Sequence, residues 1–304
     1  MIELKNWNIF KMDYNHSTEH IPDSFKEVLL WASSFLKKAG NEPFAAEWLM
    51  REQFDLTKTE LIINFLKPMQ ADDKEQYIKN IYAHVEGTPV QQIVGHEWFY
   101  GRKFIVSTDT LIPRPETEEL VELMLKEAED EPLSVLDIGT GTGAIACTIK
   151  AERPQDTVTA VDISPEALET ARKNGVALGT KITWLEGDLT KSVSGQVFDV
   201  IISNPPYIGE DEVGTLEEGV RKTEPSLALF AGKDGLDIFR RLADELPTIM
   251  HENSKVYLEM GFQQGDALKN ILSKAFPYRS VKVIKDISGK DRMVRMGEEE
   301  SYPQ

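Results

Sequence analysis

The sequence predicts an α/β domain built on a mainly parallel, doubly wound sheet, with a small helical bundle ahead of it. Two observations carry this prediction. From Pro115 onward, short runs rich in β-branched residues alternate with stretches of helical periodicity, which is the pattern of strand–helix–strand units. Before about residue 90 the chain shows helical periodicity and no clear strand pattern.

Seven strands are expected in the α/β part. Their ranges are 133–137, 157–162, 181–185, 198–203, 255–260, 279–285 and 291–296. The last two ranges are too close together for a helix between them. We therefore expect them to pair as an antiparallel hairpin.

Four short helices are expected in the first part of the chain. The first ends at Gly40, and the second begins near Pro43. Thr57 and Glu60 form the pattern of a capping box at the start of the third, and the fourth covers 73–84. Short helices with brief connections favour a small bundle.

The domain limits follow from these patterns. We assign 1–88 to the helical bundle and 114–304 to the α/β domain. Between them, 89–113 contains two β-rich runs on either side of Gly101, which predicts a hairpin that serves as the interdomain linker.

Composition narrows the classes of partner. The 304-residue chain has a net charge of −17, which argues against binding nucleic acid mainly through phosphates. It contains no run of about 18 apolar residues and no secretory signal pattern, and its single cysteine, Cys147, suits a reducing compartment. We expect a cytoplasmic protein that does not bind membranes, and a monomer.

A glycine-rich loop is the clearest ligand signal. It follows the strand 133–137 and precedes a helix, the context in which such a loop binds a nucleoside-bearing cofactor. The candidate cofactor-binding residues in it are Gly139, Thr140, Gly141, Thr142 and Gly143. The loop also satisfies a dinucleotide fingerprint. Asp137, just before it, would favour an amine or sulfonium and repel a pyrophosphate.

Two further strand ends carry acidic residues. Asp162 ends the second strand about 20 residues after the glycine loop, where it can accept hydrogen bonds from ribose hydroxyls. Asp188 follows the third strand and is placed to accept from the amino group of an adenine, although a solvated turn would look the same. No metal ion is expected at this site.

The stretch Asn204-Pro205-Pro206-Tyr207 ends the fourth strand. Ligands of open α/β sheets bind at the carboxyl ends of the strands, so it faces the same crevice as the glycine loop. The side-chain oxygen of Asn204 can accept one N–H of a planar –NH2 group, and a carbonyl of the rigid proline pair can accept the other. The ring of Tyr207 offers a face for stacking. These residues suit the methylation of an amide or an exocyclic base amine.

Taken together, these motifs resemble the amino-methyltransferases that use S-adenosyl-L-methionine. The segments 111–118, 89–101 and 258–265 narrow the resemblance to the HemK/PrmC family, the peptide chain release factor glutamine methyltransferases. The resemblance covers roughly residues 20 to 297. It implies a Rossmann-like class I methyltransferase fold, with a seven-stranded sheet whose last strand is antiparallel.

The resemblance also implies an activity. The enzyme would transfer a methyl group from S-adenosyl-L-methionine to the side-chain nitrogen of the glutamine in the Gly-Gly-Gln loop of release factors, leaving S-adenosyl-L-homocysteine. The first domain would dock the substrate. Asn204, Pro205, Pro206 and Tyr207 would hold the glutamine, and Asn204, Pro205 and Tyr207 would act in catalysis. The glycine loop, Asp162 and Asn204 would hold the cofactor. Leu189, at a position that is often aromatic, allows an apolar contact in place of ring stacking.

Three alternatives remain open. A nucleic-acid methyltransferase acting on adenine or guanine would use Asn204 and the prolines equally well, but it needs a means of gripping a strand, and no basic segment is present. An NAD oxidoreductase explains the glycines but gives the segment 204–207 no task. A binding module without activity would be expected to have lost one of these residues.

Overall fold

The computed structural model describes residues 23–215 and 223–298. The chain divides into two compact units, the first ending at Val94 and the second beginning at Gly95. The expected linker, 89–113, contributes helix α6 (Val90–Val94) to the first unit and a hairpin to the second. The part of the expected helical region that precedes residue 23 lies outside the described residues.

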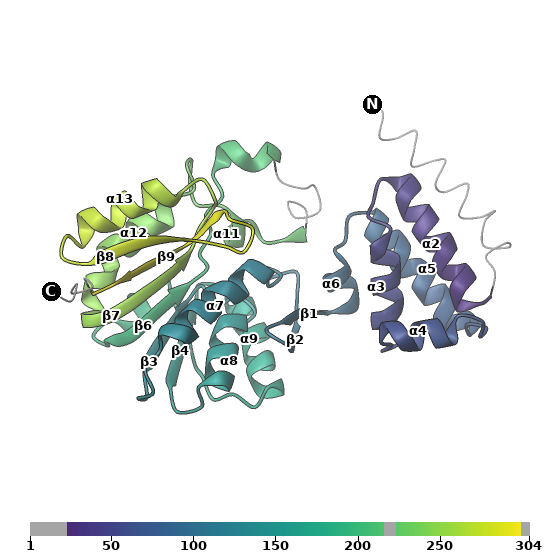
Figure 1. Ribbon diagram of the computed structural model, residues 1–304, viewed down its shortest axis with the longest axis horizontal. Helices are drawn as coiled ribbons and strands as arrows, with labels where there is room; N and C mark the ends of the chain where they lie inside the picture. Colours follow the sequence, from purple (N-terminus) through teal and green to yellow (C-terminus); the bar gives the residue numbers. More distant parts are fainter. Residues whose placement is uncertain (1–22, 216–222, 299–304) are drawn as a thin grey trace. The chain divides into compact units, whose positions relative to one another are not determined.

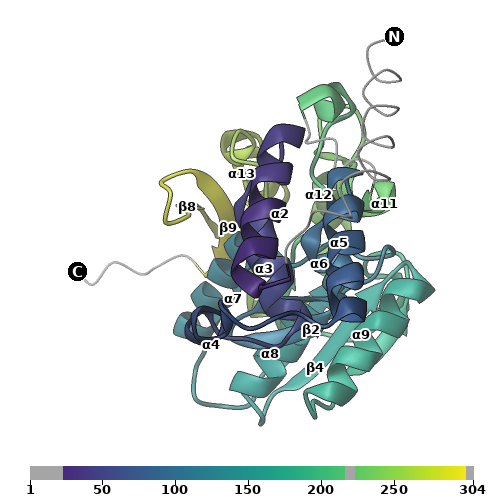
Figure 2. The same ribbon diagram turned by 90° about the vertical axis from the view of Figure 1, so that its right-hand side faces the viewer.

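The first unit contains the four expected helices and α6. Their bounds are α2 (Phe25–Ala39), α3 (Phe44–Gln53), α4 (Lys58–Asn64) and α5 (Ala71–Val85). α2, α3 and α5 lie side by side (Figure 2). Their buried side chains, which include Leu36, Leu49 and Tyr77, form one apolar core. The capping box of α4 is confirmed, because Thr57 and Glu60 each bond the other's backbone N–H.

The second unit opens with the predicted hairpin. Strand β1 (His96–Phe99) pairs antiparallel with β2 (Arg102–Ile105). Tyr100 and Gly101 connect them with φ angles of 50° and 71°, as a two-residue turn with the right-handed twist of a hairpin requires.

A seven-stranded sheet forms the centre of the second unit. Its strands are β3 (Ser134–Ile138), β4 (Thr157–Asp162), β5 (Thr183–Glu186), β6 (Phe198–Ser203), β7 (Met250–Glu259), β8 (Ser280–Lys285) and β9 (Asp291–Gly297). They lie in the order β5-β4-β3-β6-β7-β9-β8. β9 runs opposite to the other six strands and pairs antiparallel with both β7 and β8, which confirms the predicted final hairpin and the antiparallel last strand. β7 begins at Met250, five residues before the expected strand.

Helices cover both faces of this sheet (Figure 1). α7 (Pro115–Glu127), α8 (Ala144–Glu152) and α9 (Pro165–Ala177) lie on one face, and α12 (Asp237–Glu245) and α13 (Gly265–Ala275) on the other. Short helices complete the unit: η2 (Lys191–Val193), η3 (Glu210–Thr215), α11 (Ser226–Leu229) and η4 (Leu246–Thr248). Successive residues of a strand point to opposite faces of the sheet. Val200 belongs to the apolar core under α7 and α8, and Ile201 to the core under α12 and α13.

The topology brings five strand ends to one edge. β3 to β7 are parallel, so their carboxyl ends meet there. Ile138 pairs with Val161 of β4 and with Ser203 of β6. The chain order reverses at β3, and such a reversal opens a ligand-binding crevice in doubly wound sheets. No helix within the described residues is long and apolar enough to cross a membrane.

Candidate active site

The glycine loop connects β3 to α8 in a left-handed backbone conformation. Gly139, Gly141 and Gly143 have φ angles of 72°, 54° and 79°, which L-residues with a Cβ adopt only at a cost. The N–H groups of Gly139 and Thr140 both donate to Val161 O, at 2.8 and 3.0 Å. These bonds hold the loop against the end of β4.

Gly143 differs from the other two glycines. A Cβ at Gly139 or Gly141 would meet nothing within 4 Å, whereas one at Gly143 would lie 3.0 Å from Trp184 Cη2. Gly139 and Gly141 line the cavity described below, and Gly143 does not. Gly143 therefore permits close packing behind the loop, and its predicted contact with a cofactor stays a prediction.

Asp137 does not face the crevice, contrary to what the sequence led us to expect. Its carboxylate is fully buried, and its Oδ2 accepts from Thr140 Oγ1 at 2.6 Å and from Ala146 N at 3.2 Å. Burial raises the pKa of Asp137 to about 7, and nearby Asp162 adds to the increase. Asp137 therefore holds the glycine loop in place from below. The sequence alone could not show this, because it does not reveal that Thr140 closes over the carboxylate.

Asp162 lies where the sequence placed it, at the end of β4. Oδ2 accepts from Gly141 N at 2.8 Å, and Oδ1 accepts from Ser164 N at 2.9 Å. Burial raises its pKa, while the bonds from Ser164 and Gly141 lower it. A carboxylate has about four acceptor positions, so Asp162 can still accept hydrogen bonds from hydroxyl groups in the cavity.

The negative charge of Asp188, which follows β5, is neutralised by two neighbouring cations. Asp188 accepts from Lys191 Nζ at 2.6 Å and from Arg241 Nη2 at 2.7 Å. The hydrogen bond from Lys191 lowers its pKa. Leu189 has a positive φ of 54°, an uncommon conformation for a non-glycine residue that tends to occur at functional sites. Both residues line the cavity.

Asn204 directly follows β6. Its Nδ2 donates to Thr117 Oγ1 at 3.0 Å, and the preceding residue, Ser203, donates its hydroxyl to Ile138 O at 2.6 Å. The end of β6 is thereby joined to β3 and to the first turn of α7. Pro205 and Pro206 come next and line the cavity together with Asn204.

Tyr207 takes a different position. It does not line the cavity; its ring packs against the core beneath α12 and α13. Its hydroxyl donates to Glu259 Oε1 at 3.3 Å, and its carbonyl accepts from Gln264 Nε2 at 2.8 Å. Burial, with the charge of Glu259 next, raises its pKa. The stacking role that the sequence gave to this ring stays a prediction.

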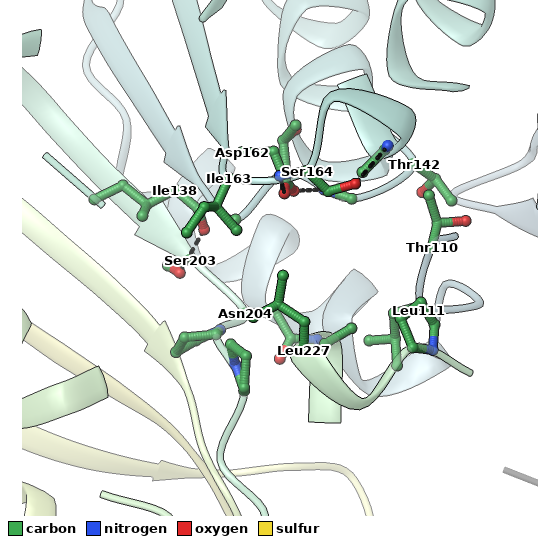
Figure 3. A pocket seen from close by; sticks show the side chains of 18 of the residues that line it. Thr110, Leu111, Ile138, Thr142, Asp162, Ile163, Ser164, Ser203, Asn204 and Leu227 are labelled. Carbon is green, nitrogen blue, oxygen red and sulfur yellow. Dashed lines mark hydrogen bonds between the residues drawn. The ribbon is translucent and has the colours of Figure 1, made fainter. Parts of the chain in front are cut away.

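The cavity has a volume of about 310 Å³, within the range of small-molecule sites. Figure 3 shows Asp162, Ser164 and Thr142 on one side of it, and Asn204 and Leu227 across from them. Other parts of the chain to which the sequence had given no role also contribute to its wall. Among these residues are Phe99 of the hairpin, Thr108, Asp109, Thr110, Leu111, Pro113, Arg114 and Thr117 before and in α7, Ala144 and Ile145 of α8, Ile163 and Ala167 after β4, Gly187 after β5, and Pro225, Ala228, Ile238 and Arg241 further along the chain.

Two buried polar side chains support the wall from outside the cavity. Asn174 of α9 donates to Thr142 O at 2.9 Å and exchanges bonds with the backbone of Ile105. Glu259 ends β7, with 1% of its surface exposed, and accepts from Thr117 Oγ1 at 2.6 Å. Burial raises the pKa of Glu259 to about 7. The sequence context of Asn174 does not mark it as part of a site. Glu259 lies in the segment 258–265 that carries the family resemblance, but that segment gives it no role, because each residue acts through contacts made only in the folded chain.

The arrangement suits one kind of chemistry. One part of the cavity has a carboxylate and an open glycine loop, which fit the hydroxyl groups and close approach of a nucleoside. The part around Asn204 has an amide side chain and the carbonyls of two prolines. A ligand with N–H donors and one with a nucleoside can thus lie side by side in one cavity.

Two family models match the chain. The methyltransferase small domain matches residues 116–224, and the PrmC N-terminal domain matches residues 27–95. Among solved structures, the chain resembles a methyltransferase from Pyrococcus furiosus, with a TM-score of 0.50 and 20% identity. That likeness covers 75% of this chain and 98% of the other, and it concerns the fold alone.

Curated relatives are closer in sequence. The release factor glutamine methyltransferase of Enterococcus faecalis is 44% identical over 88% of this chain and 96% of its own length. The enzyme of the same name from Bacillus subtilis is 43% identical over 88% of this chain and 96% of its own. The fold and the cavity at the strand ends define a class I methyltransferase. Within that class, the chain belongs to the release factor glutamine methyltransferase family.

Proposed function

We propose that this protein transfers a methyl group from S-adenosyl-L-methionine to the side-chain amide nitrogen of the glutamine in the Gly-Gly-Gln motif of peptide chain release factors. One observation carries the proposal. Asn204, held by Thr117, lines the same cavity as the glycine loop and Asp162. The names of the curated relatives support the same substrate.

The residues present fit the cofactor. Asp162 has free acceptor capacity for the two ribose hydroxyls, and the space that a Cβ would occupy at Gly139 and Gly141 is open. Ile163, Leu189 and Ile238 line the cavity with apolar surface suited to a flat base. Bound there, S-adenosyl-L-methionine supplies an electrophilic methyl group.

Asn204 and Pro205 would hold the glutamine amide. A primary amide nitrogen has two hydrogens and a delocalised lone pair, so it is a weak nucleophile that must be aligned. The Oδ1 of Asn204 would accept one hydrogen and a carbonyl of the proline pair the other. The Tyr207 carbonyl is already bonded to Gln264, so Pro205 and Pro206 carry the available carbonyls.

No strong base is needed for this step. Once the nitrogen has gained the methyl group its proton is very acidic and leaves to water. The contribution of the protein is then alignment of the nitrogen with the methyl group, which accounts for about 7–11 kcal/mol in favourable cases.

The remaining expectations about partners follow from this substrate. We propose that the first unit docks the release factor, and that the protein acts as a monomer in the cytoplasm without binding nucleic acid itself. Light scattering on a size-exclusion column would test the monomer directly, because a dimer would have twice the mass.

The decisive experiment is mass spectrometry of a bacterial-type release factor after incubation with this protein and S-adenosyl-L-methionine. We expect one added methyl group, mapped to the glutamine of the Gly-Gly-Gln motif and absent from a factor with alanine at that position. Asn204→Ala should lose transfer. Asn253→Ala, an exposed asparagine in β7 at the opposite edge of the sheet, is the matched control and should retain it.

A different result would change the assignment. If the release factor gains no methyl group while S-adenosyl-L-homocysteine still binds, the proposed substrate is wrong. Methylation of adenine or guanine in a nucleic acid under the same conditions would establish the alternative activity.

A further inference from the structure

A chain of hydrogen bonds links the side chain of Asn204 to the buried carboxylate of Glu259. Glu259 accepts from Thr117 Oγ1 at 2.6 Å through Oε2 and from the Tyr207 hydroxyl at 3.3 Å through Oε1. Thr117 in turn accepts from Asn204 Nδ2 at 3.0 Å. Glu259 and Thr117 are 1% and 5% exposed, so water does not compete for these bonds.

The direction of the chain is set by Glu259. An ionised carboxylate only accepts hydrogen bonds, and a threonine hydroxyl has a single hydrogen to donate. Because Thr117 gives that hydrogen to Glu259, its oxygen can only accept from Asn204. The NH2 end of the Asn204 amide must therefore face Thr117, and its oxygen is left on the opposite side.

This direction matters for the transfer reaction. An asparagine amide that rotates by half a turn exchanges its oxygen and its NH2 group with little change in shape. In the rotated state, Asn204 would present hydrogens to the hydrogens of the incoming amide. Such a site would repel the substrate group that it must hold.

We propose that Glu259, acting through Thr117, is a positioning residue that keeps the oxygen of Asn204 directed at the methyl-accepting nitrogen. The proposal rests on the proposed function for its substrate, and on the geometry alone for the orientation of Asn204. The pairing joins the end of β7 to the start of α7, so the orientation depends on tertiary packing.

Protonation of Glu259 would release the constraint. Burial raises the pKa of Glu259 to about 7; the bond from Thr117, the charge of Arg292 and the bond from Tyr207 oppose this, and the charge of Glu116 adds to it. A protonated carboxyl group can itself donate to Thr117, and Thr117 can then donate to the oxygen of a rotated Asn204. We therefore expect kcat to fall as pH falls through about 7.

The first measurement reads the orientation without the reaction. In 15N-labelled protein, the side-chain NH2 signal of Asn204, assigned with Asn204→Ala, should shift as Glu259 titrates. Glu259→Gln and Thr117→Val should each abolish that titration. Thr148→Val is the matched control, because the hydroxyl of Thr148 is buried without a bonding partner within the described residues, and it should leave the signal unchanged.

The second measurement is methyl transfer to the release factor. Thr117→Val should lower kcat by about tenfold or more, with the affinity for S-adenosyl-L-homocysteine unchanged. Thr117→Ser restores the hydroxyl and should recover the loss. The acid limb of the kcat profile should vanish in Glu259→Gln, whereas an acid limb due to Asp137 would persist.

The outcomes separate the two proposals. An Asn204 signal that does not respond to pH or to either substitution overturns the positioning role, as does a Glu259→Gln enzyme that keeps the acid limb of the wild type. If Glu259→Gln does not fold, the comparison of Thr117→Val with Thr117→Ser decides in its place. If the titration is present but the wild-type protein methylates no release factor, the positioning stands and the proposed substrate fails.

Discussion

The backbone N–H of Gly141 donates a 2.8 Å hydrogen bond to Asp162 Oδ2 and so couples the glycine loop to the end of β4. One carboxylate thus shapes the loop and faces the cavity. Loss of the carboxylate is expected to weaken ligand binding for two reasons, because the loop loses a bond that shapes it and the cavity loses a hydrogen-bond acceptor.

Asp162→Ala should therefore weaken binding of S-adenosyl-L-homocysteine by about tenfold or more, because hydrogen bonds to a charged group are worth about 1.5–3 kcal/mol. Isothermal titration calorimetry would measure the change. The matched control is Asp199→Ala, since Asp199 bonds Ser134 and His251 at the amino end of the strands. Equal affinity in the Asp162 variant and the wild type would refute a role for Asp162 in the cavity.

Gly143→Ala should destabilise the protein more than Gly179→Ala. Both glycines have positive φ, at 79° and 67°, so alanine costs about 1–2 kcal/mol at each. A Cβ at Gly143 would in addition lie 3.0 Å from Trp184 and 3.1 Å from Ala171, whereas one at Gly179 meets nothing within 4 Å. We expect a further loss of about 1–3 kcal/mol at Gly143.

Urea unfolding of the two glycine variants would measure this difference. The same free energy of unfolding for both would mean that the packing behind the loop relaxes freely.

Stability should depend on pH through Asp137. Its folded-state pKa is raised to about 7, above the ~3.9 of an unfolded chain. The folded protein then binds more protons between these values, so this group lowers the free energy of unfolding as pH rises from about 4 to about 7. Asp137→Asn keeps an acceptor for Thr140 and removes the titration.

The stability of Asp137→Asn relative to the wild type should therefore increase as pH rises from about 4 to about 7. Chemical denaturation at several pH values would measure it. A difference that stays constant over this range would show that Asp137 titrates like an exposed carboxyl group.

Arg114 should stabilise the protein through Glu224. Arg114 Nη2 donates to Glu224 Oε1 at 2.5 Å, and Oε2 of this buried carboxylate has no partner within the described residues. Arg114→Ala would leave the charge unpaired and should cost about 1–3 kcal/mol. Arg240→Ala removes exposed ion pairs with Asp234 and Asp237 and should cost less than about 1 kcal/mol.

Thermal unfolding would compare the two arginine variants. In the Arg114→Ala background, Glu224→Gln should restore part of the loss because it removes the buried charge. If Glu224→Gln restores no stability, the loss in Arg114→Ala comes from the missing packing contacts of the arginine side chain.

Much of the fold was predictable because its signals are local. The alternation of strand and helix patterns identified the doubly wound sheet, and the short gap between 279–285 and 291–296 identified the antiparallel hairpin that β8 and β9 form. The early start of β7, at Met250, escaped prediction because its first residues include exposed polar ones. Met250 pairs with Phe198 of β6, and the pairing resumes only at Lys255 after an irregularity, so this part of the strand has no alternating apolar pattern.

The site was predictable where its residues follow strands. The glycine loop, Asp162 and Asn204 each end a strand of a parallel sheet, so local sequence was enough to bring them to one edge. Asp137 belongs to the same motif, yet it is turned beneath the loop by Thr140 and Ala146. The direction of a side chain at a strand end depends on which groups close over it.

The sequence by itself determined the class of fold, the edge of the sheet that holds the cavity and the residues that line its centre, because strand patterns and turn residues act over a few positions. Only the tertiary structure decided how those residues are held. Thr117 and Glu259 are 142 positions apart, and their bond exists only because the packing of α7 on the sheet brings a hydroxyl against a buried carboxylate. No local pattern encodes a contact of that range, and on it depends which end of the Asn204 amide faces the cavity.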